Sequence, residues 1–404
     1  MPSVVPEFEP ARSFARPTVS SAAALTVVAL PTFLLGAFAP TLKQELGFGD
    51  AALGALFSAG YFVSAAGLHF GGRLADERGV TPTLRAGVGI AAVACLVMSL
   101  TADSYLVLIA IFLAIRVAES LVHPATNALI SQAVPVHQQG RSLGVKQSAI
   151  PLSTALAGIA VPVLGGSIGW RGTFAIVAIA AVPVFLTLPH RPAPAPRLRT
   201  NAPSLWRVRH LQLIGIGGGL AAASVVTVGG FLTTAGQEAG FSEGEAGLLL
   251  GMGGMLMIAS RVTWGWLADR FRFDRFLAVA ASVAIGSVSF LLFATESKPM
   301  LIAGSALAFG VAWSWPGIAL LGVIELHPDA PGAASAVIQS LVRLGALASP
   351  LLFGVIADRY GFSAAWMLSF ACAASGVVMM LLGSIAAKRF TAATQAPEML
   401  GLDD

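Results

Sequence analysis

Residues 72–79 read Gly-Arg-Leu-Ala-Asp-Glu-Arg-Gly, and residues 265–270 read Gly-Trp-Leu-Ala-Asp-Arg. The two stretches begin about 193 residues apart, close to half the length of the chain. Other residues match at nearly the same shift: Pro124 with Pro316, Val145 with Val337, Gln147 with Gln339, Ser148 with Ser340 and Gly169 with Gly361. Chance matches between helices rich in glycine and alanine would not keep a constant offset over three regions. A repeat of half the chain is typical of transporters built from two bundles around a central site.

The composition around this repeat indicates a membrane protein. Of the 404 residues, 56% are hydrophobic and 11% are charged, whereas a soluble domain carries about 25% charged residues. The net charge is +4, but the basic residues are spread over many short loops, which disfavours nucleic-acid binding. Cys95 and Cys372 lie in apolar stretches of opposite halves, so we interpret them as packing residues rather than a disulfide or metal site.

Twelve apolar stretches are long enough to cross a bilayer, which requires about 20 residues each. They fall near 20–41, 51–71, 85–101, 104–130, 143–167, 173–189, 211–234, 246–267, 276–294, 299–324, 335–357 and 365–387. The first stretch also resembles a signal peptide, but its cleavage would leave eleven helices and remove the symmetry of the repeat. We therefore predict an all-α membrane protein with twelve transmembrane helices in two six-helix pseudo-symmetric bundles.

The predicted organisation follows from these spans. It comprises an N-terminal tail at 1–19, a bundle at 20–189, a linker at 190–210, a bundle at 211–387 and a C-terminal tail at 388–404. Most lysines and arginines outside the spans fall on the side of the termini and linker, whereas Lys43, Arg171, Lys298 and Arg359 fall on the other side. Basic loops stay cytoplasmic. Both termini are therefore expected in the cytoplasm, with the chain in a bacterial inner membrane.

The stretch at 72–79 resembles the signature G-x-L-A-D-R-x-G-R-K of the major facilitator superfamily, and the resemblance covers the whole chain. In that family the loop acts as a latch that holds one conformation. Glycine permits a tight turn, and an aspartate near a helix N-terminus senses its dipole. Glu77 stands where the family usually has arginine. The resemblance assigns gating roles to Gly72, Asp76, Gly79, Gly265, Asp269 and Arg270.

Two further resemblances favour different transport directions. Gly144-Val145-Lys146-Gln147, followed by Pro151, Gly158 and Gly169-Trp170-Arg171, resembles the cyanate-permease-like branch, whose substrates are mostly unknown. Pro162-Val163-Leu164-Gly165-Gly166 resembles part of the exporter motif G-P-x-x-G-G, although Val161 replaces its first glycine. Uptake and export therefore both remain open.

Ionisable residues inside the predicted spans are few, and such residues usually mark a pathway. Arg116, Glu119 and His123 are spaced i, i+3, i+7 and share one helix face. We predict that Glu119 and His123 carry a coupling proton; the alternative is that Arg116 and Glu119 merely neutralise each other. Arg116 resembles an arginine linked to proton coupling in exporters, and Arg261 resembles one that engages carboxylates in monocarboxylate and oxalate transporters. The predicted substrate-binding residues are Arg116, Lys146, Gln147, Arg261, Gln339 and Arg343.

The sequence contains no phosphate-binding loop, nucleophile elbow or metal-ligand cluster, so neither ATP-driven transport nor catalysis is expected. No cofactor is expected beyond a coupling H+. The leading hypothesis is a monomeric secondary active transporter in contact with membrane lipid. It would move a small anionic solute across the inner membrane by alternating access, coupled to protons. A proton-driven exporter of drugs or metabolites is the alternative, and a non-transporting membrane sensor is a minor one.

Overall fold

The computed structural model describes residues 13–188, 205–327 and 330–399. Within them all regular elements are helices. The N-terminal half contains α1 (Ala15–Ala37), α2 (Ala39–Leu46), α3 (Asp50–Arg78), α4 (Val80–Thr101), α5 (Tyr105–Ala133), α6 (Val136–Gln147), α7 (Ala149–Ala160), η1 (Val161–Gly165) and α8 (Gly166–Thr187). The C-terminal half contains η2 (Leu205–Arg207), α9 (Arg209–Glu238), α10 (Glu243–Arg270), α11 (Arg275–Phe293), α12 (Lys298–Leu307), η3 (Ala308–Ala312), α13 (Pro316–Leu326) and α14 (Pro331–Met399).

Two glycines divide the longest helical segments into separate spans. The described residues contain 10 segments that are long and apolar enough to cross a membrane, and two of these, His137–Thr187 and Ala333–Ala392, are far longer than one crossing. Gly169 has φ 65° and Gly361 has φ 84°, a left-handed conformation that favours glycine. Each break splits one long segment in two. The sequence prediction of twelve membrane helices in two pseudo-symmetric bundles is therefore confirmed.

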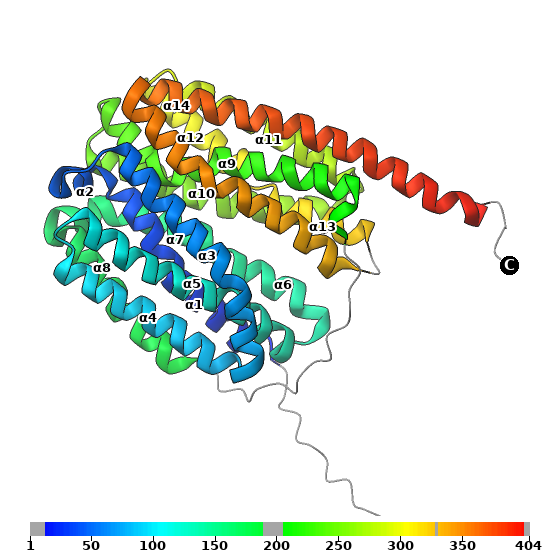
Figure 1. Ribbon diagram of the computed structural model, residues 1–404, viewed down its shortest axis with the longest axis horizontal. Helices are drawn as coiled ribbons and strands as arrows, with labels where there is room; N and C mark the ends of the chain where they lie inside the picture. Colours follow the sequence, from blue (N-terminus) through cyan, green and yellow to red (C-terminus); the bar gives the residue numbers. More distant parts are fainter. Residues whose placement is uncertain (1–12, 189–204, 328–329, 400–404) are drawn as a thin grey trace, which may run out of the picture.

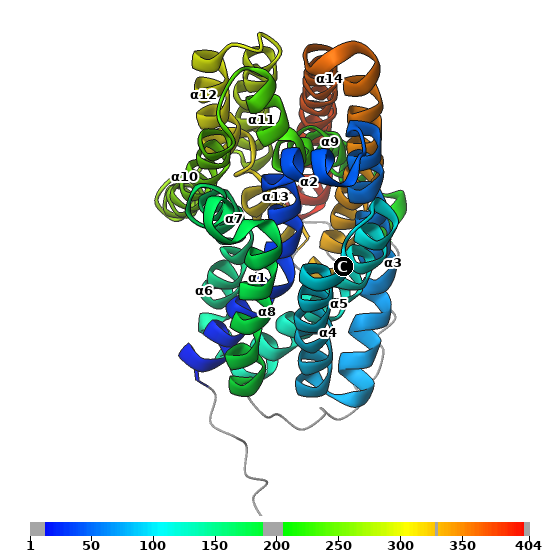
Figure 2. The same ribbon diagram turned by 90° about the vertical axis from the view of Figure 1, so that its left-hand side faces the viewer.

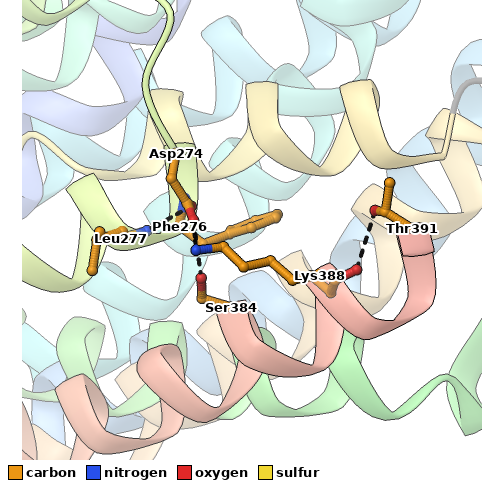
Figure 3. Close-up of polar contacts among 7 residues, drawn as sticks. Asp274, Phe276, Leu277, Ser384, Lys388 and Thr391 are labelled. Atoms are coloured by element: carbon orange, nitrogen blue, oxygen red, sulfur yellow. Dashed lines mark hydrogen bonds and ion pairs between the residues drawn. The ribbon is translucent and has the colours of Figure 1, made fainter.

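Local sequence explains where several helices begin. Ser242 and Glu245 form a capping box at the start of α10, and the Ser104 hydroxyl accepts the Val107 N–H at the start of α5. The Asp274 carboxylate accepts the N–H groups of Phe276 and Leu277 and so caps α11 (Figure 3). These side chains satisfy backbone donors that a helix cannot satisfy by itself.

The two halves form two layers, with α1 to α8 below and α9 to α14 above in Figure 1. Seen from the α2 end, α7 lies beside α10 and α3 lies beside α14 (Figure 2). Glycines permit these contacts, because a Cβ on Gly54 would collide with the Pro350 carbonyl and one on Gly158 with the Gly251 backbone. The Asp358 carboxylate of α14 also accepts the N–H groups of Asp50 and Ala51, at 2.8 and 2.7 Å, and so caps α3 across the halves.

Among the described residues, one buried apolar cluster is shared by the two halves, and it lies at the α2 end. At the α2 end one cluster contains side chains of both halves, including Phe57, Phe231 and Phe353. At the opposite end, here called the terminal end, the described residues form two separate clusters. One belongs to the N-terminal half and the other to the C-terminal half. The described residues therefore close the molecule at the α2 end, and at the terminal end they form a separate apolar cluster in each half.

Several helix boundaries differ from the sequence prediction. The first helix begins at Ala15 rather than near residue 20, and α14 continues to Met399 instead of ending near 387. Figure 1 shows this part of α14 extending beyond the bundle. It is fastened there because Lys388 binds Asp274 at 2.9 Å (Figure 3). Residues 1–12 of the predicted N-terminal tail, 190–204 of the predicted linker and 400–404 of the C-terminal tail lie outside the described residues.

Candidate substrate cavity

A cavity of about 240 Å³ lies between the two halves. It is walled by α3 and α5 from one half, and by α9, α14 and the segment between η3 and α13 from the other. The lining residues are Tyr61, Ser64, Ala65, Leu68, Arg116, Glu119, His123, Ala222, Val225, Val226, Trp313, Trp315, Pro316, Val342, Arg343 and Ala346. Three predicted residues of α5 thus meet the predicted Arg343 of α14 in one cavity.

Arg116 is buried, and its Nε and Nη1 atoms are engaged by protein groups. Its Nε donates to the Gly60 carbonyl at 3.2 Å, and its Nη1 donates to the Thr32 hydroxyl at 3.0 Å. It also forms an ion pair with Glu119 one helical turn away, and its guanidinium lies 5.2 Å from the centre of the Tyr61 ring. Only 4% of Arg116 is exposed. The spacing on α5 therefore produces the predicted shared face, but Arg116 already has its counter-ion.

Arg343 has no such engagement, because the described residues give its side chain no hydrogen bond or ion pair. Arg116 and Glu119 line the same cavity from the opposite half. His123 lies one turn beyond Glu119 on the same wall. The cavity thus holds one neutralised arginine and one arginine without a protein counter-ion among the described residues.

Four other predicted substrate-binding residues do not line this cavity. Lys146 is buried and donates to the Asn127 amide oxygen, while Gln147 and Gln339 are exposed. Arg261 of α10 crosses between the halves, with its Nη1 donating to the Gln147 carbonyl at 3.0 Å. The prediction put Gln147 inside a continuous fifth span. In the structure the polar helix α6 ends at Gln147 and a separate apolar helix, α7, begins two residues later.

Three aromatic residues that line the cavity were not among the predicted site residues: Tyr61, Trp313 and Trp315. The two tryptophans lie where the tenth span is interrupted between η3 and α13, just before Pro316. In a continuous α-helix, residues two apart point to different sides, so the interruption lets both rings line one cavity. The sequence Trp313-Ser314-Trp315-Pro316 inside an apolar span was the available signal, since proline disrupts the helix that precedes it.

Comparison with known families identifies the fold. Residues 22–350 match the family model described as the Major Facilitator Superfamily. The chain belongs to this superfamily. It is a membrane transporter rather than an enzyme, and its substrate is a small molecule.

The proteins to which this transporter is similar are distant. A probable sugar efflux transporter of Haemophilus influenzae (strain PittGG) is 26% identical over 65% of this chain and 67% of the relative. The multidrug resistance protein MdtG of Salmonella paratyphi C is 26% identical over 88% of this chain and 92% of the relative. A bacterial homologue of the human lysosomal transporter Spinster, solved in an inward-facing, unoccupied conformation, has 14% identity and a TM-score of 0.72. The match covers 93% of this chain and 97% of that structure, which shows the shared fold.

The predicted gating motif of the superfamily lies at the terminal end of both halves. Gly72 is inside α3, Asp76 is exposed in its last turns, and Gly79 ends the helix with φ 97°. In the second copy, Gly265, Asp269 and Arg270 all belong to the last turns of α10. The turn therefore occurs at Gly79 and not at Gly72 or Gly265. A latch role for these residues and a place in the cyanate-permease-like branch remain predictions.

Proposed function

We propose that this transporter moves a small anionic solute across the bacterial inner membrane by alternating access, coupled to protons through Glu119 and His123. The observation that carries the proposal is the unequal state of the two cavity arginines. Arg116 has Glu119, Thr32 and the Gly60 carbonyl as partners, whereas the described residues leave Arg343 without one.

An anion would supply the counter-charge that Arg343 lacks. A cation deep in a membrane protein costs several kcal/mol unless a partner compensates it. A carboxylate can accept two parallel hydrogen bonds from the planar guanidinium, which makes arginine well suited to bind it. The cavity volume also favours a small solute. It is about 240 Å³, below the roughly 300–1,000 Å³ of pockets for drug-sized ligands.

Alternating access is supported by the arrangement of the apolar clusters. The shared cluster closes the α2 end, and the separate clusters leave the terminal end to open. With both termini in the cytoplasm, as the basic residues predict, this arrangement is the inward-facing state. The solute would then leave or enter the cavity from the cytoplasm while α3, α7 and α1 stay packed on α14, α10 and α9.

We assign proton coupling to Glu119 because it is paired with Arg116 and lines the same cavity as Arg343. Protonation of Glu119 would leave Arg116 with its two neutral partners and would raise the net positive charge beside Arg343. An anion and a proton would then favour each other's binding, as symport requires. His123 lies one turn away and offers a second proton acceptor on the same wall.

Proton-driven export is the second candidate. The sugar efflux and multidrug relatives support it, as does the partial exporter motif at Pro162–Gly166, which spans η1 and the first residue of α8. The same cavity and the same Glu119 would serve an exporter, with the proton and the solute moving in opposite directions.

A stability screen on purified protein tests the anion proposal. We expect carboxylates to raise the melting temperature and cationic dyes to leave it unchanged. Arg343→Lys keeps the charge but loses the fork geometry, so it should weaken anion binding by roughly 10-fold, about 1.4 kcal/mol. Arg272→Lys, in the exposed loop after α10, is the matched control and should behave like the wild type. Saturable binding of a cation that is undiminished in Arg343→Lys would overturn the proposal in favour of drug export.

A further inference from the structure

The formal charges of the cavity leave one positive charge uncompensated. Arg116 and Glu119 form an ion pair and cancel, and both lie on the wall from the N-terminal half. Arg343, on the opposite wall, is the remaining formal charge among the described lining residues. While Glu119 is ionised, a ligand with a single negative charge would make the occupied cavity electrically neutral. In that state a dianion would bring one charge without a partner, which is costly in a membrane interior.

The wall from the C-terminal half is almost entirely apolar. Apart from Arg343, its lining residues are Ala222, Val225, Val226, Trp313, Trp315, Pro316, Val342 and Ala346. Besides Arg343, the polar groups of this wall are the indole N–H groups of Trp313 and Trp315, and the Trp315 N–H has no hydrogen-bond partner among the described residues. The other wall adds the polar side chains of Tyr61, Ser64 and His123, so the several hydroxyl groups of a sugar would find partners mainly there. Burying unpaired hydroxyls is unfavourable, so this wall suits an apolar ligand body.

Trp313 provides a fixed flat surface on this wall. Its ring is stacked on Phe309, with centroids 5.6 Å apart and planes 17° apart. A Cβ on Gly229 of α9 would lie 3.4 Å from the ring, so the ring also packs closely against that helix. Trp313 is nevertheless partly exposed where it lines the cavity. A ring held in this way can stack on a planar ligand with little loss of conformational entropy.

We propose that the substrate is an amphipathic monoanion, with one carboxylate for Arg343 and a flat apolar body for the Trp313 wall. This inference rests on the proposed function and narrows its substrate class. The carboxylate lies against the guanidinium of α14, and the apolar body extends along the residues of α9 and the interrupted tenth span. Sugars, inorganic dianions and dicarboxylates do not match this arrangement.

Calorimetric titration of the purified protein with five probes tests the substrate class. Benzoate carries one charge and a ring, acetate lacks the ring, benzamide lacks the charge, succinate carries two charges, and glucose is a neutral polyol. We expect benzoate to bind at least about tenfold more tightly than acetate or succinate, because the ring buries apolar surface. Benzamide and glucose should give no saturable heat. Benzamide also controls for partition of the ring into detergent.

Substitutions of the tryptophan separate stacking from charge. Trp313→Leu should weaken benzoate binding by roughly fivefold and leave acetate binding unchanged, because only benzoate has a ring to stack. Trp313→Phe keeps a smaller ring, so its affinity for benzoate should lie between those of the wild type and Trp313→Leu. This variant also tests the stacking if the leucine variant folds poorly. Trp206→Leu, in the exposed η2 outside the cavity, is the matched control and should bind benzoate like the wild type.

The outcomes distinguish this inference from the proposed function. If acetate or succinate binds as tightly as benzoate, or if both Trp313 variants bind benzoate normally, the amphipathic class is wrong while anion transport stands. If no carboxylate binds and glucose does, both proposals fail. Tight benzoate binding that is lost in Arg343→Gln and reduced in Trp313→Leu supports both.

Discussion

At the scale of single residues, Glu119 shows how one carboxylate can serve two cations. It is paired with Arg116 on its own helix, and it lines the same cavity as Arg343 of α14. Arg116 keeps two hydrogen-bond acceptors, Thr32 and the Gly60 carbonyl, when the ion pair is lost. Arg343 has no described partner to replace it, so the protonation state of Glu119 mainly controls the charge that an entering anion meets.

Glu119→Gln should uncouple anion binding from pH. The substitution mimics the protonated carboxyl, so we expect anion affinity at neutral pH to rise by about fivefold or more and to become independent of pH. Concentrative transport driven by a pH gradient should be lost in proteoliposomes, while exchange of labelled anion across the membrane continues. Asp103→Asn, which removes an exposed carboxylate in the loop between α4 and α5, outside the cavity, is the control. Accumulation of solute by the Glu119→Gln variant would move the proton site to another residue, with His123 the first candidate.

At the scale of helices, the terminal end of the C-terminal half is held by polar pairs among α9, α11, α13 and α14. Arg275 of α11 binds Glu325 of α13, and Lys388 of α14 binds Asp274 (Figure 3). His210 of α9 and His327 after α13 lie with Nε2 atoms 2.8 Å apart and ring planes 15° apart. Centroids 5.0 Å apart at this nitrogen separation indicate rings placed edge to edge, joined by one shared N–H rather than stacked by their faces.

This histidine pair predicts a stability that depends on pH. Burial lowers the pKa of His327 from its ordinary value of 6.5. Below about pH 6.5 the unfolded chain therefore binds more protons than the folded chain. The contribution of His327 to the free energy of unfolding is complete above that pH, and it falls as the pH drops toward the folded pKa. Two protonated rings would also lose their hydrogen bond, which is worth about 1 kcal/mol.

Melting temperatures between neutral and mildly acidic pH check this prediction. The difference between wild type and His327→Gln should be largest at neutral pH and should shrink as the pH falls, because the wild type loses its pair. His137→Gln, at an exposed position on α6, should follow the wild-type curve. A constant difference between wild type and His327→Gln over the whole range would show that the pair does not titrate.

At the scale of the whole molecule, alternating access requires the joined end to separate. The contacts there combine close approaches of glycine backbones with the shared apolar cluster that includes Phe57, Phe231 and Phe353. The Asp358 carboxylate is different, because it caps the first turn of α3 from the other half. A negative charge at a helix N-terminus stabilises by about 0.3–1 kcal/mol, and by up to about 2 kcal/mol when partly buried.

Asp358→Asn should therefore shift the molecule toward the state that is open at the α2 end. We expect the ratio of the two states to change by about two- to thirtyfold, the equivalent of about 0.4–2 kcal/mol. The rate at which a maleimide modifies a cysteine placed at Ser58, beside α14, reports this opening. Asp103→Asn, in the exposed loop between α4 and α5 at the same end, is the control. Equal labelling rates in wild type and Asp358→Asn would refute a closing role for the cap.

The sequence alone determined the class, the span count and the repeat, because membrane helices are specified locally by length and hydropathy. It also determined the shared face of Arg116, Glu119 and His123, since helical periodicity fixes which residues are neighbours. Only the tertiary structure shows the contacts between helices, which helical periodicity does not specify. It gives Arg116 its protein partners and leaves Arg343 without a described one. It also places four predicted binding residues outside the cavity lining, namely Lys146, Gln147, Arg261 and Gln339. Those outcomes depend on where helices end, bend and cross, which is set by packing between residues on different helices, such as Arg116 with Gly60 and Arg261 with Gln147.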